Sequence, residues 1–197
     1  MSTVPSADHS HRYAGFWIRA GSQILDALIT IPFILVHAFM LNAYRLGALY
    51  TFVPFEGLHL FYSVYLVYRF GGTPGKLLMA IRITSLDGSP VTLRQAFIRE
   101  APALAMSTLA TLGQCLALFQ VTDAEFYARS WLDRQRYIAQ FDPGWLFWVI
   151  VVMQLWTWSE LIVMLTNRAR RALHDFIAGT VVIKKEFAEP IAVPVSG

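Results

Sequence analysis

Four long apolar segments dominate the pattern of hydrophobic and polar positions along this chain. A helix that crosses a membrane needs about 20 mostly apolar residues, and each of these segments is at least that long. They predict four transmembrane helices, at Phe16–Leu41, Ala48–Phe70, Ala96–Val121 and Trp145–Thr166. Pro32 lies inside the first helix and is expected to kink it.

The stretch between the second and third apolar segments has a different character. Gly71–Lys76 is rich in turn-forming residues. Ile81–Ile83 then alternates apolar and basic positions, and Asp87-Gly88 is typical of a β-hairpin turn. Val91 and Thr92 are placed to pair back across this turn, and Thr92 is a suitable cap for the third helix. This pattern predicts a short amphipathic piece and a small hairpin at the membrane surface.

The chain after the fourth apolar segment predicts one more helix and one strand. Arg168–Ile177 has the pattern of a short basic amphipathic helix, which Gly179 would end. Thr180–Ile183 has the composition of a strand, and we expect it to pair with Ile81–Ile83. The expected fold is an all-α membrane protein of four transmembrane helices with a small amphipathic and β-hairpin layer on its cytoplasmic surface.

Composition supports a membrane protein rather than a soluble one. The chain is 56% hydrophobic and 15% charged, whereas soluble domains are about 45–50% apolar and about 25% charged. We expect a disordered N-terminus at 1–12, one four-helix domain at 13–186 and a flexible tail at 187–197. The single cysteine, Cys115, excludes a disulfide framework.

The distribution of Lys and Arg predicts the orientation of the helices. With the N-terminus inside, twelve basic residues lie on inner segments and four (Arg45, Arg129, Arg134 and Arg136) on outer loops. Because basic residues concentrate on the cytoplasmic side, both termini are expected there, and Thr122–Gly144 forms an outer loop that holds a short helix. The basic excess favours anionic lipid headgroups over nucleic acid as partners, with Lys76 and Arg82 as headgroup contacts.

The first apolar segment carries two charges, Arg19 and Asp26. Seven residues on a helix are two turns, which places them on one face about 10 Å apart. Arg19 lies near the inner interface, where a long side chain reaches water. Asp26 lies deeper, where an ionised group costs about 3 kcal/mol or more. It therefore needs a partner, water or a proton.

Two other helices place polar residues at a similar depth. His59 lies about 15 Å inward from Arg69, and Glu160 lies about 12 Å inward from Arg168. Glu56 is one helical turn from His59. A layer of Asp26, His59, Glu160 and Glu56 would suit the binding of a monovalent cation or a proton. The alternative is a hydrogen-bonded layer that only fixes helix packing.

Motifs for catalysis, metal binding and cofactors are weak. His174-Asp175 has no accompanying activated nucleophile or glycine elbow. The Cys and His spacing does not match a zinc site. Gly71–Leu77 has the wrong glycine separation for a phosphate loop, and Leu77 replaces the required Ser or Thr. We therefore expect no enzyme activity, no metal and no cofactor.

Three ordered motifs carry a resemblance to a known family. The first is Ala14–Arg19 with Asp26. The second runs from Gly72 to Glu100 and includes Gly72–Lys76, Ile81–Ile83, Asp87-Gly88 and Arg99-Glu100. The third is Ala172–Val182. Over about residues 13–185 the chain resembles the RDD family of bacterial membrane proteins, which is named for one arginine and two aspartates. By motif position these correspond to Arg19, Asp26 and Asp175.

The resemblance implies a small helical domain in the bacterial cytoplasmic membrane. The molecular function of the family is largely unresolved; transport of an unspecified ligand has been suggested, and some members are described as sodium–proton antiporters. Our leading hypothesis is transport of a small solute or cation, coupled to protons, by a homo-oligomer. Arg19 and Asp175 would form a structural ion pair. The alternative is a membrane scaffold or assembly protein.

Overall fold

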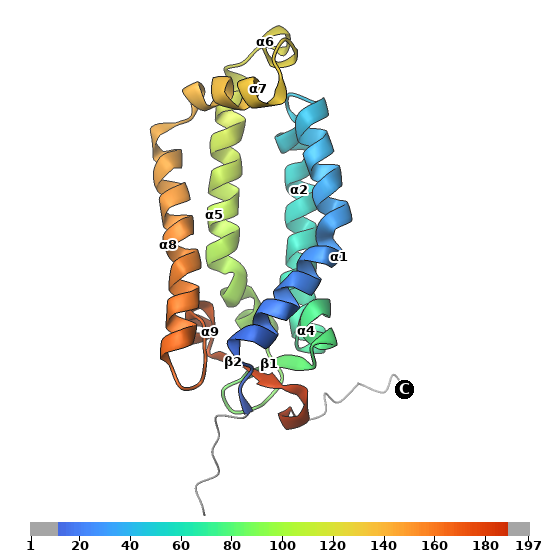
Figure 1. Cartoon of the computed structure of the whole chain (residues 1–197), viewed down its shortest axis with the longest axis vertical. Helices are drawn as coiled ribbons and strands as arrows, with labels where there is room; N and C mark the ends of the chain where they lie inside the picture. The colour runs from blue at the N-terminus through green and yellow to red at the C-terminus, as the bar shows by residue number, and fades with distance from the viewer. Residues whose placement is uncertain (1–11, 189–197) are drawn as a thin grey trace, which may run out of the picture.

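Three long helices organise the structure. The computed structural model describes residues 12–188, so the expected disordered terminus (1–12) and tail (187–197) lie almost entirely outside the described part. Within it, three helices are long and apolar enough to cross a membrane, namely α1 (Phe16–Ala43), α5 (Leu93–Phe119) and α8 (Gly144–Thr166). They run roughly parallel to one another along the long axis of the molecule (Figure 1).

The second apolar segment is not one uninterrupted α-helix. It is divided into α2 (Gly47–Leu60), a π-helical turn η2 (Phe61–Tyr65) and α3 (Leu66–Phe70). In a π turn each N–H bonds five residues back instead of four, which interrupts the regular α-helical pattern. None of the three pieces has spanning length by itself, so three helices of spanning length are shown and the expected count of four transmembrane helices is not confirmed.

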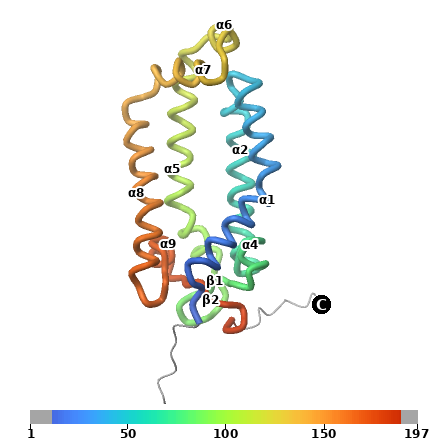
Figure 2. The backbone as a smooth tube through the Cα atoms, viewed as in Figure 1, coloured from blue at the N-terminus to red at the C-terminus, as the bar shows by residue number. Residues whose placement is uncertain are grey.

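A small sheet and several short helices gather at one end of the long helices, which we call the sheet end. Strands β1 and β2 pair antiparallel, with Ile83 opposite Val182, which confirms the expected pairing of these two segments. Both ends of the described chain lie at this end (Figure 2). The elements of the sheet end are α4 (Pro74–Leu78), β1 (Ile81–Ser85), α9 (Leu173–Ala178), β2 (Thr180–Lys184) and η4 (Lys185–Phe187).

The predicted hairpin and turn differ in detail from the structure. The residue that bridges back to β1 is Pro90, through one isolated pair with Thr84, because Thr92 instead caps α5 together with Gln95. The turn expected at Gly71–Lys76 lasts only to Thr73. Pro74 then begins α4, since its fixed φ suits the first helical position.

The C-terminal helix is shorter than expected and begins at Leu173 rather than at Arg168. Arg170 has a left-handed φ of 49°, which an α-helix does not allow. The Asn167 side chain holds this loop by accepting from the Arg171 amide at 2.9 Å and donating to the Arg171 carbonyl at 2.7 Å. Local polar contacts of this kind compete with helix formation.

The opposite end is closed by the expected outer loop, and we call it the cap end. This loop holds α6 (Asp123–Tyr127), α7 (Trp131–Ile138) and η3 (Ala139–Phe141), which lie across the ends of the long helices (Figure 1). Arg45 Nε donates to Asp123 Oδ1 at 2.6 Å, which ties the cap to the loop between α1 and α2.

Buried apolar clusters lie at both ends of the bundle. One packs Ile81, Ile83 and Val182 of the sheet against the long helices, and the other surrounds Phe126 at the cap end. Between the clusters, large apolar side chains face outward from the long helices, for example Leu35, Leu109 and Leu155. Such an apolar exterior suits contact with lipid rather than water.

Candidate functional site

A cavity of about 630 Å³ lies among α1, α5 and α8 near the sheet end. Its polar lining comes from five helices, with α4 and α9 supplying a residue each. The size falls within the range of about 300–1,000 Å³ that small-ligand sites occupy. Its charged or titratable lining residues are Arg19, Lys76, Arg99, Glu100, Glu160 and His174.

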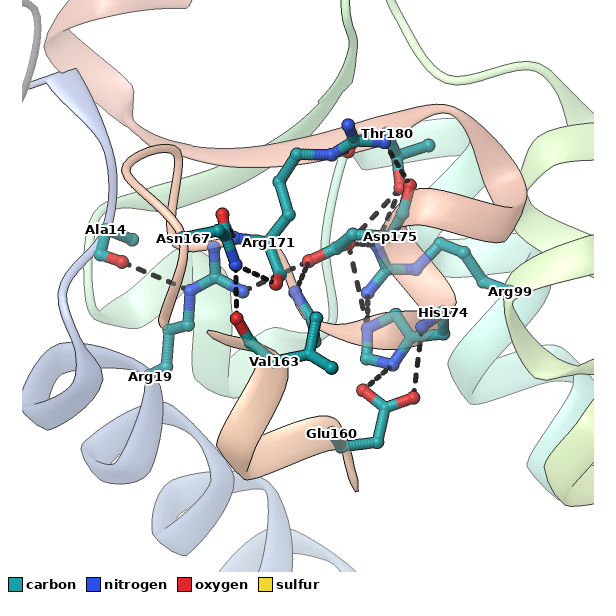
Figure 3. Close-up of polar contacts among 11 residues, drawn as sticks. Ala14, Arg19, Arg99, Glu160, Val163, Asn167, Arg171, His174, Asp175 and Thr180 are labelled. Carbon is teal, nitrogen blue, oxygen red and sulfur yellow. Dashed lines mark hydrogen bonds and ion pairs between the residues drawn. The ribbon is translucent and has the colours of Figure 1, made fainter. Parts of the chain in front are cut away.

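Beneath this cavity, the fully buried Asp175 joins three parts of the chain (Figure 3). Arg19 Nη1 of α1 lies 3.2 Å from Asp175 Oδ2, and Arg99 Nη1 of α5 contacts Asp175 Oδ1. The Ala172 amide also donates to Oδ2 at 3.0 Å, and the Thr180 hydroxyl to Oδ1 at 3.2 Å. Asp175 therefore locks α9 and β2 against both α1 and α5.

The two arginines decide the charge state of Asp175. Burial by itself would raise the pKa of this carboxyl. The charges of Arg99 and Arg19, together with the Ala172 amide, outweigh burial and hold the pKa well below its usual range. Asp175 is therefore an ionised anchor at every pH near neutrality.

His174 extends this cluster toward the cavity. Arg99 Nη2 lies 2.7 Å from His174 Nε2, and a guanidinium can only donate, so Nε2 accepts. The hydrogen then belongs on Nδ1, which lies 2.5 Å from Glu160 Oε2. The His174 backbone amide also donates to Glu160 Oε1 at 3.0 Å. In this arrangement the imidazole is neutral and bridges Arg99 and Glu160 (Figure 3).

Asp26 occupies a separate neighbourhood, between α1 and α4. Its Oδ1 accepts from the Tyr62 hydroxyl at 2.6 Å and from the Gly75 amide at 2.7 Å. Its Oδ2 accepts from the Thr73 hydroxyl at 2.6 Å, with Lys76 Nζ 3.8 Å away. Asp26 thus accepts a hydrogen bond from a backbone amide at the start of α4, where N–H groups have no partner within the helix. This contact holds α4 against α1.

The contact between α4 and α1 requires a glycine. A Cβ added at Gly75 would lie 2.3 Å from the Ser22 carbonyl oxygen and 2.6 Å from Asp26 Oδ1. Both distances are far inside van der Waals contact, so a side chain here would push α4 away from α1. Gly75 is therefore needed for the hydrogen bonds of Asp26.

Lys76 lies on α4 beside this carboxylate and also lines the cavity. Its Nζ donates to the Thr73 hydroxyl at 3.3 Å. Burial lowers the pKa of Lys76 and the charge of Arg99 lowers it further, while Asp26 and Glu100 only partly compensate. Lys76 was expected at the membrane surface and instead faces the interior. Arg82, expected to share that role, lies on β1 opposite Ile183, outside the cavity lining.

In the structure, the residues of the proposed mid-depth layer form separate pairs. His59 Nε2 lies 3.4 Å from Glu100 Oε2, and the Ser107 hydroxyl donates to Glu56 at 2.8 Å. Glu160 pairs with His174 as described above. Among residues 12–188 no hydrogen bond or ion pair joins Asp26, His59 and Glu160 to one another. Arg19 and Asp175, in contrast, lie together as the sequence analysis expects.

Arg99 and Glu100 are the important site residues that the sequence analysis left without a role. Arg99 contacts Asp175 and His174, and Glu100 contacts His59. A usable signal was present, because two adjacent charges two turns inside a long apolar helix are costly without partners. The Tyr62 and Gly75 contacts to Asp26 had no comparable signal.

Comparison with known proteins identifies the family. No curated protein and no solved structure matches the chain at a significant level. The model of the RDD family matches residues 13–179, which include Arg19, Asp26 and Asp175 and all three helices of spanning length. The chain therefore belongs to the RDD family and is a membrane protein of that family.

Proposed function

We propose that this chain transports a small polar solute across the bacterial cytoplasmic membrane, with proton movement coupled to transport. In this proposal α2, η2 and α3 together form a fourth crossing beside α1, and both termini are cytoplasmic. The basic residues gathered toward the sheet end support that orientation.

The cavity near the sheet end is the observation that carries the proposal. A space of about 630 Å³ lined by ionisable groups inside a membrane protein supports a solute pathway, because such groups are otherwise avoided there. Arg19, Lys76 and Arg99 all line it. Glu100 and Glu160 line it as well, so the wall offers both hydrogen-bond donors and acceptors, which suits a polar solute.

Two carboxylate–imidazole pairs supply groups for proton coupling. Glu160 with His174 lines the cavity, and Glu100 with His59 connects the cavity to α2. Imidazoles exchange protons near neutral pH, and movement of a charged solute past these pairs would change their preferred protonation. Asp26 would act by holding α4, and with it Lys76, at the cavity wall.

The test is solute-driven proton flux in liposomes that contain the purified chain and a pH-sensitive dye. Glycerol 3-phosphate, alanine, sodium, lithium and potassium are added separately across an imposed pH gradient. We expect at least one of the two solutes to dissipate the gradient. Glu160→Gln keeps an acceptor for the His174 amide but removes the charge, and should reduce this flux about tenfold or more, equivalent to about 1.4 kcal/mol.

The matched control is Glu186→Gln, because Glu186 is largely exposed on η4 and far in sequence from the cavity-lining residues. It should transport like wild type. Flux driven only by sodium, lithium or potassium would contradict the solute assignment. A well-folded wild-type chain without any flux would contradict transport itself.

A second function, that of a membrane scaffold, is favoured by one observation. The oxygens of Asp26 and Asp175 all accept hydrogen bonds from protein groups, as expected for carboxylates that only fix packing. Under this alternative Asp26→Asn alters stability, with no transport to lose. Transport by so few helices also implies a homo-oligomer, whereas a scaffold does not require one.

A further inference from the structure

The charged lining of the cavity has more capacity to donate hydrogen bonds than its neighbours use. Lys76 Nζ carries three N–H groups, yet within residues 12–188 its polar neighbours are the Thr73 hydroxyl at 3.3 Å and Asp26 at 3.8 Å. Arg19 Nη2 is buried and has no hydrogen-bond partner in the same described region. Donors left in this state are costly.

The acidic residues of the lining do not supply the missing acceptors. Glu160 Oε1 accepts from the His174 amide and Oε2 lies 2.5 Å from His174 Nδ1, while Glu100 Oε2 lies 3.4 Å from His59 Nε2. Asp175 is shared by Arg19 and Arg99 and cannot neutralise both. Burial, and then the charge of Arg99, lower the pKa of Lys76, so the Lys76 ammonium is incompletely compensated here. An oxyanion in the cavity would supply the missing hydrogen-bond acceptors.

Apolar and aromatic side chains form much of the remaining wall of the cavity. Phe16 comes from α1, and Trp156, Leu161 and Met164 come from α8. Gln23 of α1 and Gln154 of α8 also line the cavity and are exposed, so the cavity is open along these helices. Because α1 and α8 both have membrane-spanning length, we infer that an opening between them faces the bilayer for part of its height.

We propose that the cavity binds an anionic amphiphile that enters from the bilayer, with its phosphate on Lys76 and Arg19 and its hydrocarbon chain between α1 and α8. The charged floor matches a phosphate, which takes several charge-assisted hydrogen bonds. The apolar walls match an acyl chain. Gln23 and Gln154 at the rim provide amide groups for the polar linkage between head and chain.

This inference goes beyond the proposed transport of a small polar solute, because it assigns a ligand from the bilayer to the same cavity. Binding is an equilibrium property that is measured without flux. Binding without transport would leave the site intact and remove the transport proposal, whereas transport of soluble solutes without amphiphile binding would remove this inference alone.

The experiment measures lipid adducts on the full-length chain by native mass spectrometry in detergent. Dioleoyl phosphatidylglycerol is titrated against dioleoyl phosphatidylcholine, whose choline cation the Arg and Lys side chains repel. We expect preferential binding of phosphatidylglycerol. Lys76→Gln should weaken it about tenfold, the loss of one charge-assisted hydrogen bond, and Lys76→Arg should restore most of it. Lys185→Gln, an equal change of charge at an exposed site, should have no effect.

Inorganic phosphate distinguishes the source of the oxyanion. Millimolar phosphate that saturates the site while phosphatidylglycerol does not bind would overturn the amphiphile and leave a site for soluble oxyanions. Equal binding of both lipids, or equal binding by wild type and Lys76→Gln, would overturn the site itself. If the chain formed a dimer without lipid adducts, the opening between α1 and α8 would be assigned to contact with a second copy of the chain. This result would also overturn the proposal.

The location of the lipid is checked in vesicles through Trp156, which lines the cavity. Phosphatidylglycerol with brominated acyl chains quenches a nearby tryptophan. In a variant with the other five tryptophans replaced by Phe, Trp156 should be quenched at low mole fractions of this lipid, and the Lys76→Gln change should raise the half-quenching fraction about tenfold. Quenching that simply follows the bulk lipid fraction would count against the site.

Discussion

The neighbourhoods of Asp175 and Asp26 use the same side chain in two different ways. Each carboxylate accepts a backbone amide at the start of a short helix, from Ala172 in one case and from Gly75 in the other. Asp175 is fully buried between two arginines. The Asp26 side chain is 15% exposed, and its hydrogen bonds come from neutral groups, with one lysine 3.8 Å away.

The difference predicts which of the two sets of contacts costs more free energy to break. Removal of one partner from a buried ion pair leaves an uncompensated charge, which costs about 3–5 kcal/mol. Loss of a hydrogen bond between a carboxylate and a neutral donor costs about 1–3 kcal/mol. The Asp175 cluster is therefore a permanent anchor for α9 and β2. The Asp26 contacts hold α4 and Lys76 more weakly.

The largest expected effect comes from Asp175→Asn. This change leaves Arg19 and Arg99 buried without a negative charge, and we expect a loss of about 3–5 kcal/mol of stability. Thermal unfolding of the purified protein in detergent would show a large fall in Tm or a loss of folded protein. Asp123→Asn is the control, because Asp123 pairs with Arg45 while largely exposed. Equal effects of the two variants would refute the anchor.

The contribution of Asp175 to stability should depend on pH in the acid range. The pKa of Asp175 is lower in the folded chain than in the unfolded chain, so its stabilisation is complete above the unfolded value, about 3.9. It is lost as the pH falls through the folded value. The difference in Tm between wild type and Asp175→Asn should stay constant from about pH 7 to pH 5 and shrink below about pH 4. A difference that shrinks between pH 7 and pH 5 would contradict this assignment.

Asp26→Asn should have a smaller and more local effect. The amide keeps one acceptor oxygen but places donors against Tyr62 or Thr73, so we expect a loss of about 1–3 kcal/mol. Hydrogen exchange should quicken in α4 and around Gly75, while α9 and β2 stay protected. Equally faster exchange in α9 would show that the neighbourhoods of Asp26 and Asp175 unfold as one cooperative unit. It would contradict the difference between them.

Several parts of this picture follow from local sequence. Thr92 with Gln95 forms the expected capping box, and alternation marks both strands. The pairing of Arg19 with Asp175 followed from their similar depth and from the family motif. The partners of Asp26 did not follow, because Gly75 donates through its backbone and a backbone amide leaves no mark in a residue pattern. The π turn at Phe61–Tyr65 also had no sequence signature.

By itself the sequence determined the membrane class, the family, three of the long helices and the pairing of two strands. Each of these depends on local hydrophobic content, on spacing or on a motif. Only the tertiary structure decided which polar groups pair. His59 pairs with Glu100, Glu160 pairs with His174, and Lys76 lies at a cavity wall. Helical rise gives the depth of a residue, whereas the rotation and packing of each helix decide which residues of equal depth meet.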